Sequence, residues 1–296
     1  MTDSGLPPAT EARNAATRGL DLMPTEELVG VLVGEQADAA AAVARAAPAL
    51  ARAVDGISER LRAGGTLHYV GAGTSGRLAT LDAAECPPTF GTPPSLVVAH
   101  IAGGATALVA AVEGAEDDAA AGAAVLRDRV GAADAVVGIS ASGGARYVVA
   151  ALETARAAGA LTIAVTGVAG SSLARAADMA IVVETGAEPI AGSTRMRAGT
   201  AQKVVLNALS TATMVRLGRV HDNVMVDVVA TNAKLRERAE RLVRELTGAG
   251  AARARELLAL AGGNVKVAVV IERRGVDAAE ARARLQGSGG FLRPHL

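Results

Sequence analysis

The chain has 296 residues, with 30 basic and 30 acidic side chains, one cysteine, no tryptophan, two tyrosines and two phenylalanines. This length allows one large domain or two smaller ones, with a core that Ala, Val and Leu must build. The balanced charge gives no attraction to nucleic acid or an anionic membrane, and the scarcity of aromatic residues argues against base-stacking recognition. A single cysteine excludes an internal disulfide or a Cys-cluster metal site.

The amino terminus has neither the basic nor the apolar segment of a secretion signal. No charge-free apolar run reaches the ~18 residues that a membrane helix requires. The four histidines have no metal-ligand spacing, and His68 falls in a predicted strand. We therefore expect a cytoplasmic protein that uses no metal and no organic cofactor.

The first elements in chain order are an irregular arm at residues 1–20 and a helical region at residues 24–63. Pro48 is expected to divide this helical region into two, and Gly64 and Gly65 are expected to end it.

Short apolar runs then alternate with helical segments, which predicts a parallel sheet with helices on both faces. We expect a doubly wound α/β fold with five strands in the flavodoxin-like order 2-1-3-4-5. The predicted strands are residues 66–70, 95–101, 134–139, 161–165 and 180–183. The predicted helices of this region are residues 75–84, 105–112, 117–129 and 146–157.

From about residue 195 onward the pattern is helical again. Two long helices are predicted at residues 198–217 and 226–246, and a three-helix bundle at residues 251–261, 264–271 and 277–285. These patterns divide the chain into an N-terminal arm with helices (1–63), an α/β domain (64–222) and a helical C-terminal region (223–296).

A Gly-rich loop, GAGTSGR at residues 71–77, follows the first predicted strand. It matches the dinucleotide fingerprint, but the second strand lacks the acidic residue that would bind a ribose, and Thr74 and Ser75 add hydroxyls where a pyrophosphate needs bare backbone. Hydroxyls and backbone N–H groups at a helix N-terminus suit a monophosphate instead. We therefore predict phosphate binding by Gly73, Thr74, Ser75, Gly76 and Arg77.

A second hydroxyl-rich loop follows the third predicted strand and contains Ser140, Ser142 and Gly143. In the order 2-1-3-4-5 the first and third strands are neighbours, so both loops would flank one crevice where such folds bind ligands. Gly and Ser are also common in ordinary strand–helix turns, but two such loops at one crevice favour a phosphate site. No Walker A pattern is present, so nothing indicates nucleoside triphosphate hydrolysis.

Two carboxylates accompany these loops. Glu85 lies in DAAECPP, near the end of the helix that starts in the first loop, where Pro87 and Pro88 are expected to stop that helix. Glu116 lies in an acidic cluster after the second strand, where it is either a helix N-terminal acid or a functional group. Two carboxylates near one crevice can divide acid and base roles if their environments separate their pKa values.

Six segments resemble the N-acetylmuramic acid 6-phosphate etherases, and the resemblance spans roughly residues 9–292. They are residues 71–77, 82–88, 101–104, 112–117, 192–203 and 223–232. The resemblance implies a sugar isomerase (SIS) domain followed by a helical C-terminal region. It also implies release of D-lactate from N-acetylmuramic acid 6-phosphate by elimination and hydration without metal, giving N-acetylglucosamine 6-phosphate, in the recycling of peptidoglycan amino sugars.

By motif position, Glu85 corresponds to the acid that protonates the leaving ether oxygen, and Glu116 to the base that takes the C2 proton. Ser193 and Lys203 are expected to contact the substrate. Arg195 and Arg197 are either further contacts to the phosphate or lactyl carboxylate, or helix-surface charges. The chain has residues 144–146 (GAR) where the family usually has Arg-Thr-Pro, and Arg197 where Lys is common, which puts these contacts in question.

The eukaryotic glucokinase regulatory protein is similar in motif but senses sugar phosphates without converting them. A non-catalytic sensor and an aldose–ketose isomerase of the same fold are therefore the alternatives. The expected partners are a small sugar phosphate and a second copy of the chain, because the fold and the Ala-rich long helices suit a homodimer.

Overall fold

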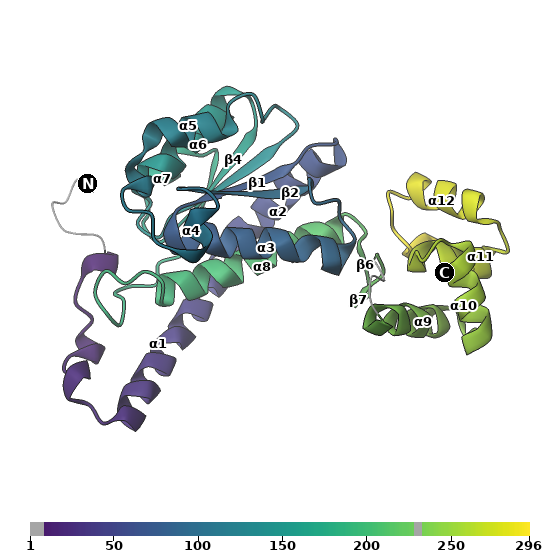
Figure 1. The fold of residues 1–296 in the computed structure, drawn as a ribbon, viewed down its shortest axis with the longest axis horizontal. Helices are drawn as coiled ribbons and strands as arrows, with labels where there is room; N and C mark the ends of the chain where they lie inside the picture. Colours follow the sequence, from purple (N-terminus) through teal and green to yellow (C-terminus); the bar gives the residue numbers. More distant parts are fainter. Residues whose placement is uncertain (1–8, 228–232) are drawn as a thin grey trace. The chain divides into compact units, whose positions relative to one another are not determined.

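The computed structural model describes residues 9–227 and 233–296, which fall into two compact units (Figure 1). Unit 1 comprises Met1–Ala83 and Ser95–Ser210, and unit 2 comprises Ala84–Pro94 and Thr211–Leu296. Two long helices, α3 (Gly73–Phe90) and α8 (Arg197–Arg216), contribute residues to both units. None of the helices in the described ranges is both long and apolar enough to cross a membrane.

Unit 1 is built on a five-stranded parallel sheet of order β2-β1-β3-β4-β5, which confirms the predicted α/β fold and strand order. The middle strands are buried along their whole length, as expected when helices cover both faces. Gly71 of β1 aligns with Ile139 of β3, so the loops after these strands leave the sheet side by side. The strands are β1 (Leu67–Gly71), β2 (Val97–Ile101), β3 (Ala135–Ile139), β4 (Leu161–Thr166) and β5 (Met179–Val182).

One face of the sheet packs against α5 (Ala119–Leu126), α6 (Arg146–Ala157) and α7 (Ser172–Ala176), and Val70 and Val136 lie in this core. Neighbouring side chains of a strand point to opposite faces, so Tyr69 faces the other layer. There its hydroxyl donates to Asp82 of α3 at 3.0 Å, and Ser210 of α8 donates to the second Asp82 oxygen at 3.1 Å. A buried carboxylate thus joins β1, α3 and α8.

The predicted division of the first helical region is confirmed. Helices α1 (Thr25–Arg45) and α2 (Ala47–Arg62) meet at Ala46, and Pro48 lies in the first turn of α2. Proline is tolerated there because the first N–H groups of a helix have no partner within the helix. Helix α2 packs on β3, β4 and β5.

The N-terminal arm forms three short 3-10 turns between Ala9 and Leu22. It is fastened to the loop before α8, because the Gly192 N–H donates to the Thr10 carbonyl at 2.9 Å and the Thr17 hydroxyl donates to the Pro189 carbonyl at 2.8 Å.

The prediction that Pro87 and Pro88 stop the helix of the first loop is wrong, since α3 continues to Phe90. Each proline removes a hydrogen bond to the carbonyl four residues earlier. The turn persists because Phe90 is buried and the Gly91 N–H donates to the Pro87 carbonyl at 3.0 Å.

The segments after β2 are shorter than predicted: α4 (Thr106–Val109), a 3-10 turn at Ala115–Asp117, and α5. Gly114, at φ +72°, starts this 3-10 turn in the left-handed conformation, and Asp128, at φ +60°, follows the end of α5. The periodicity of this Ala-rich sequence favours two longer helices. The left-handed backbone at Gly114 and Asp128 limits the length of the helices that form. Helix α7 has no counterpart among the predicted elements.

The helix predicted at residues 226–246 begins later, because α9 spans Ala233–Thr247. Before it, β6 (Val220–His221) and β7 (Val224–Met225) form an antiparallel hairpin that the sequence analysis missed, and Asp227 lies in a bend after it. Residues 228–232, which the prediction assigned to this helix, lie outside the described residues.

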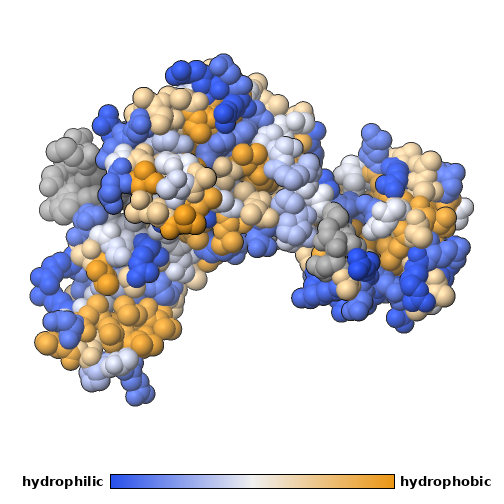
Figure 2. Space-filling model, viewed as in Figure 1, coloured by the Kyte–Doolittle hydropathy of each residue, from blue (hydrophilic) through white to orange (hydrophobic). Residues whose placement is uncertain are grey.

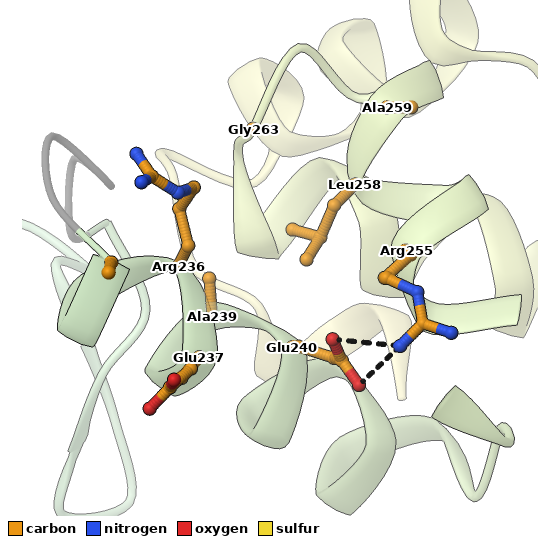
Figure 3. Close-up of a pocket in the computed structure, with 9 residues that line it drawn as sticks. Arg236, Glu237, Ala239, Glu240, Arg255, Leu258, Ala259 and Gly263 are labelled. Carbon is orange, nitrogen blue, oxygen red and sulfur yellow. Dashed lines mark hydrogen bonds and ion pairs between the residues drawn. The ribbon is translucent and has the colours of Figure 1, made fainter. Parts of the chain in front are cut away.

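In unit 2, α9 shares one apolar core with three shorter helices, α10 (Ala251–Leu260), α11 (Val265–Arg274) and α12 (Ala278–Gly287). The first seven residues of α11 are all buried, as expected for a helix surrounded by others. A groove between α9 and α10 has Ala239 and Leu258 among its lining residues, and a Glu240–Arg255 ion pair of 3.2 Å joins the two helices beside it (Figure 3).

Candidate functional site

The first loop is a tight turn from β1 into α3, which begins at Gly73 in the left-handed region at φ +51°. A Cβ at Gly76 would lie 2.5 Å from the Ile101 side chain and 2.9 Å from the Gly71 carbonyl oxygen. Glycine therefore allows the first turn of α3 to pack directly on the strands. The N-terminus of a long helix thus lies at the carboxyl edge of the sheet, where its unpaired N–H groups and dipole favour an anion.

The hydroxyls of this turn differ in their surroundings. Ser75 is buried and donates a 2.9 Å hydrogen bond to Oε1 of Gln202 on α8. Thr74 is half-buried, and its methyl group faces Gly199 of α8. A Cβ at Gly199 would lie 3.5 Å from this methyl group. The predicted ligand Ser75 is therefore engaged within the chain, and its partner Gln202 is a site residue that the sequence analysis did not name.

Arg77, predicted to bind substrate, fastens the segment after β2. Its Nε donates to the Ala107 carbonyl at 2.9 Å and one terminal nitrogen donates to the Ala110 carbonyl at 3.0 Å. The guanidinium thus holds the α4 segment next to the first turn of α3.

The second loop has its serines bonded to its own backbone. Ser140 Oγ accepts the Gly143 N–H at 3.2 Å, and Ser142 Oγ accepts the Gly144 N–H at 3.3 Å. Gly143 has φ +69°, and a Cβ there would lie 2.2 Å from the Ser171 hydroxyl. In the atypical residues 144–146, Arg146 is the exposed first residue of α6.

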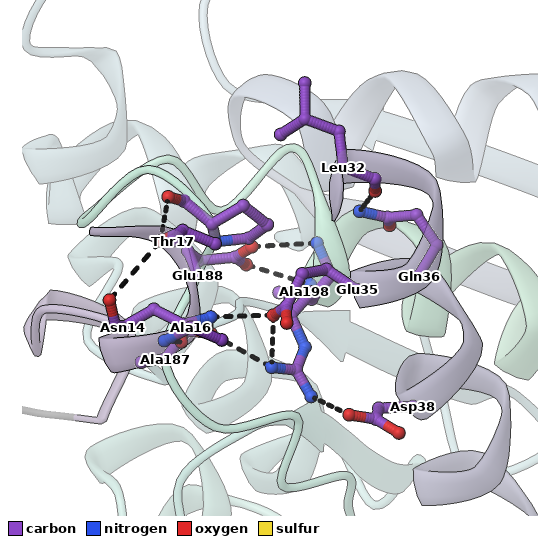
Figure 4. A network of polar contacts seen from close by, with 12 residues as sticks. Asn14, Ala16, Thr17, Leu32, Glu35, Gln36, Asp38, Ala187, Glu188 and Ala198 are labelled. Atoms are coloured by element: carbon purple, nitrogen blue, oxygen red, sulfur yellow. Dashed lines mark hydrogen bonds and ion pairs between the residues drawn. The ribbon is translucent and has the colours of Figure 1, made fainter. Parts of the chain in front are cut away.

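The N-terminus of α8 is held by a carboxylate that the sequence did not reveal (Figure 4). Glu188 is fully buried and accepts the N–H groups of Arg197 at 2.8 Å and Ala198 at 2.9 Å. Two of the N–H groups without a partner within the helix are thereby satisfied. The Arg197 guanidinium forms ion pairs with Glu35 at 3.0 Å and Asp38 at 3.2 Å, so it is engaged with α1.

The other predicted residues of this segment lie before and within α8. Ser193 is half-buried and Arg195 exposed in the loop that precedes the helix. Lys203 is half-buried, and its ammonium donates to the side-chain oxygen of Asn207, one turn further along α8, at 2.5 Å.

Both predicted catalytic carboxylates are exposed, Glu85 on α3 and Glu116 in the 3-10 turn before α5. The N-cap of α5 is Asp118, which accepts the Ala121 N–H at 2.9 Å, whereas Glu116 is an acid in the first turn of the 3-10 helix before it. Within the described ranges, no hydrogen bond or ion pair engages either of the two carboxylates. Each is therefore accessible to a ligand.

The parts of unit 1 that meet at the carboxyl edge of the sheet are the turns after β1, β3 and β4 and the first turns of α8. Ala141, Thr166, Gly167 and Gln202 line one small cavity there. The described residues contain no group of three or more His, Cys, Asp or Glu side chains arranged to hold a metal ion. The N-terminus of α3 and the two hydroxyl-rich turns make this edge suited to a small anionic ligand.

Comparison with known proteins defines the class first. Residues 49–156 match the glucokinase regulatory protein N-terminal SIS domain, and residues 108–212 match the SIS domain. A phosphoheptose isomerase from Francisella tularensis has the same fold, with a TM-score of 0.52 and 21% identity over 65% of this chain and 100% of that chain. The fold is therefore that of a SIS-domain protein.

Full-length relatives then define the family. An N-acetylmuramic acid 6-phosphate etherase from Serratia proteamaculans is 50% identical over 288 residues, 97% of each chain. One from Rubrobacter xylanophilus is 52% identical over 289 residues, 97% of this chain and 95% of that one. The chain belongs to the N-acetylmuramic acid 6-phosphate etherase family, as the motifs predicted.

Proposed function

We propose that this chain cleaves the D-lactyl ether of N-acetylmuramic acid 6-phosphate, giving N-acetylglucosamine 6-phosphate and D-lactate, in the recycling of peptidoglycan amino sugars. The observation that carries the proposal is the 50% identity, over 97% of both chains, to the Serratia proteamaculans protein named for this reaction. The fold supports it, because the N-terminus of α3 provides an anion site at the sheet edge.

In this proposal the 6-phosphate binds at the N-terminus of α3, with Gly73, Thr74 and Gly76 beside it. Ser75 is the buried member of the turn, and its bond to Gln202 fixes the turn against α8. The second loop faces the same crevice, since β1 and β3 are neighbours. Its proposed contacts are Ser140, Ser142 and Gly143, with Ser193 and Lys203 contributed by the α8 segment.

The chemistry requires an acid and a base. Glu116 takes the C2 proton of the open-chain sugar, whose aldehyde makes that proton acidic. The C2 electrons form a double bond to C3 as the C3–oxygen bond breaks, and Glu85 protonates the departing lactyl oxygen. Water then adds at C3 and a proton returns to C2. Each proton transfer of this kind contributes ~10²–10⁴-fold to a rate.

The test is release of D-lactate from N-acetylmuramic acid 6-phosphate by the purified protein. The Glu85→Gln variant, which keeps the side-chain shape but cannot supply the proton, is expected to lower kcat by ~10²–10⁴-fold while sugar-phosphate binding persists. Glu113→Gln, an exposed carboxylate in the same acidic segment as Glu116, is the matched control and should retain wild-type turnover.

Two outcomes would contradict this proposal. Wild-type protein that is stabilised by hexose 6-phosphates but releases no lactate would be a sensor. Interconversion of glucose 6-phosphate and fructose 6-phosphate, again without lactate release, would indicate an isomerase.

We further propose that the chain forms a homodimer through α1. Leu22 just before this helix is 83% exposed, and Val29 and Val33 on it are 52% and 67% exposed. These residues belong to an apolar surface over α1 (Figure 2). Residues 28–34 of α1 carry no charge, and a helix that is apolar on several sides is normally covered.

A second copy of the chain is the proposed cover for this surface. Light scattering at assay concentration should give twice the monomer mass. Val33→Glu should lower that mass by introducing a charge into the interface, and a monomeric wild type would contradict the proposal.

A further inference from the structure

Unit 2 contains a buried lysine that the proposed reaction does not use. Lys266 on α11 is 7% exposed, and its ammonium has three acceptors. It donates to the carbonyls of Gly218 at 3.1 Å and Gly290 at 2.9 Å and forms an ion pair with Asp227 at 2.6 Å. Burial lowers the pKa of Lys266, and the Asp227 carboxylate opposes this shift. A buried lysine in such a complete set of partners has a defined structural task.

Asp227 is buried between two cations, since Arg219 also reaches its carboxylate at 3.4 Å. The backbone of the same residue lies against Gly91, the residue that follows α3. A Cβ on Gly91 would be 2.0 Å from the Asp227 carbonyl oxygen, and Gly91 has φ +62°. Only glycine permits both the conformation and the close approach.

This contact lies at the end of the helix that carries Glu85. Pro87 and Pro88 cannot donate to the carbonyls four residues earlier, so the turn of α3 around Glu85 lacks two of its internal hydrogen bonds. The Gly91 N–H closes the next turn by donating to the Pro87 carbonyl at 3.0 Å. Since the helix's own bonds are incomplete here, contacts from outside the helix must contribute to its position.

We infer that Lys266 is a positioning residue for Glu85, acting through Asp227 and Gly91. Lys266 pairs with Asp227 and fixes it from the core of the C-terminal helices, the Asp227 backbone fits against Gly91, and Gly91 closes the turn of α3 that directly follows Glu85. The inference rests on the proposed acid role of Glu85. It assigns the C-terminal helices a task in the reaction: they hold the proton donor in place.

The test is the Lys266→Met variant, which replaces the ammonium with an apolar side chain of similar length. It leaves the buried Asp227 carboxylate with Arg219 alone, so the chain segment against Gly91 is expected to shift. A misplacement of about 1 Å can cost ~10²-fold in rate, and we expect a 10- to 100-fold loss of kcat. KM should stay near the wild-type value, because the phosphate turns belong to unit 1.

The matched control is Arg253→Met in the same unit. Arg253 forms ion pairs with Glu256 at 2.9 Å and Glu272 at 2.8 Å on the surface of the helices, away from Asp227. It should leave kcat unchanged. Equal kcat values in Lys266→Met and the wild type would overturn the inference.

A double variant separates positioning from general destabilisation. If Lys266 acts through Glu85, adding Lys266→Met to Glu85→Gln causes no further loss of residual lactate release. Losses that multiply would show that Lys266 acts independently of Glu85 and would overturn the inference.

If Lys266→Met does not fold, Gly91→Ala tests the same contact without removing a charge. It should lower kcat with little change in KM, and a wild-type kcat in Gly91→Ala would contradict the inference. Wild-type turnover in Glu85→Gln would show that Glu85 is not the acid, and the inference about Lys266 would fail with it. If Glu85→Gln is inactive but Lys266→Met turns over like the wild type, the acid role of Glu85 stands and only the inference about Lys266 is overturned.

Discussion

Two buried carboxylates, one in each compact unit, have different kinds of partner. In unit 1, Glu188 is 0% exposed and its two oxygens accept backbone N–H groups at the start of α8, at 2.8 and 2.9 Å. In unit 2, Asp227 lies between the side-chain cations Lys266 and Arg219, at 2.6 and 3.4 Å. The first carboxylate uses peptide groups that the helix already fixes, whereas the second joins segments that are far apart in the sequence.

This difference separates two tasks of buried charge. A carboxylate at a helix N-terminus stabilises one helix end, and its loss should affect stability more than turnover. A carboxylate that pairs with cations from distant segments fixes the positions of those segments. Its loss should therefore affect the functional residues that the segments position. The Lys266→Met variant tests the second statement, and the following variant tests the first.

The largest expected stability effect is that of Glu188→Gln. The amide keeps one acceptor oxygen, loses the negative charge, and leaves one buried N–H of α8 facing an amide NH₂ group. Hydrogen bonds to a charged group are each worth about 1.5–3 kcal/mol, so we expect the free energy of unfolding to fall by about 3 kcal/mol. Urea unfolding measures this change as a lower midpoint at an unchanged slope.

The control for this variant is Glu184→Gln, an exposed carboxylate four residues earlier in the same loop. Surface substitutions of this kind usually change stability by less than about 0.5 kcal/mol. If the two variants unfold at the same urea concentration, Glu188 does not stabilise the N-terminus of α8. The contrast between Glu188 and Asp227 would then be lost.

The architecture of unit 1 follows from local patterns, which is why the sequence predicted it. Short apolar runs alternating with helical segments specify a doubly wound sheet, and the order β2-β1-β3-β4-β5 agrees with that prediction. The Gly-rich turn after β1 was predicted for the same reason, because its glycines serve the local backbone. Gly73 has a positive φ, and Gly76 leaves no room for a Cβ. Family motifs located Glu85 and Glu116, whose roles remain predictions.

The partners of the site residues could not be predicted, because they depend on contacts between distant segments. Ser75 looks like a phosphate ligand in the sequence, yet it donates to Gln202, 127 residues away. Arg197 looks like a surface or substrate charge, yet its partner Glu35 lies 162 residues earlier. Tertiary packing also overrode the local rule at Pro87, where burial of Phe90 sustains a helix that proline would otherwise end.

A smaller effect is expected from two imidazoles of unit 1, the buried His68 and the partly exposed His100. His68 on β1 and His100 on β2 stack with their ring centroids 5.3 Å apart, and Nδ1 of His68 lies 3.0 Å from Nε2 of His100. Burial, with contributions from His68 and Arg129, lowers the pKa of His100 to about 4. Burial also lowers the pKa of His68, which Asp134 opposes.

The sign of the pH dependence follows from these shifts. An unfolded histidine takes up a proton near pH 6.5, whereas folded His100 does so only near pH 4. Between these values the unfolded state binds more protons, so the free energy of unfolding falls as the pH falls. Because His100 is partly exposed on an edge strand, we expect a loss of only about 1 kcal/mol between pH 7 and pH 5.

Urea unfolding of the wild type and of His100→Gln at several pH values measures this difference. The variant should lose less stability on acidification than the wild type, because it removes the group with the largest shift. Parallel profiles would show that His100 is protonated equally in both states. That result would contradict the contrast between these groups, in which Glu188 and Asp227 have N–H or cationic partners, whereas burial lowers the pKa of His68 and His100.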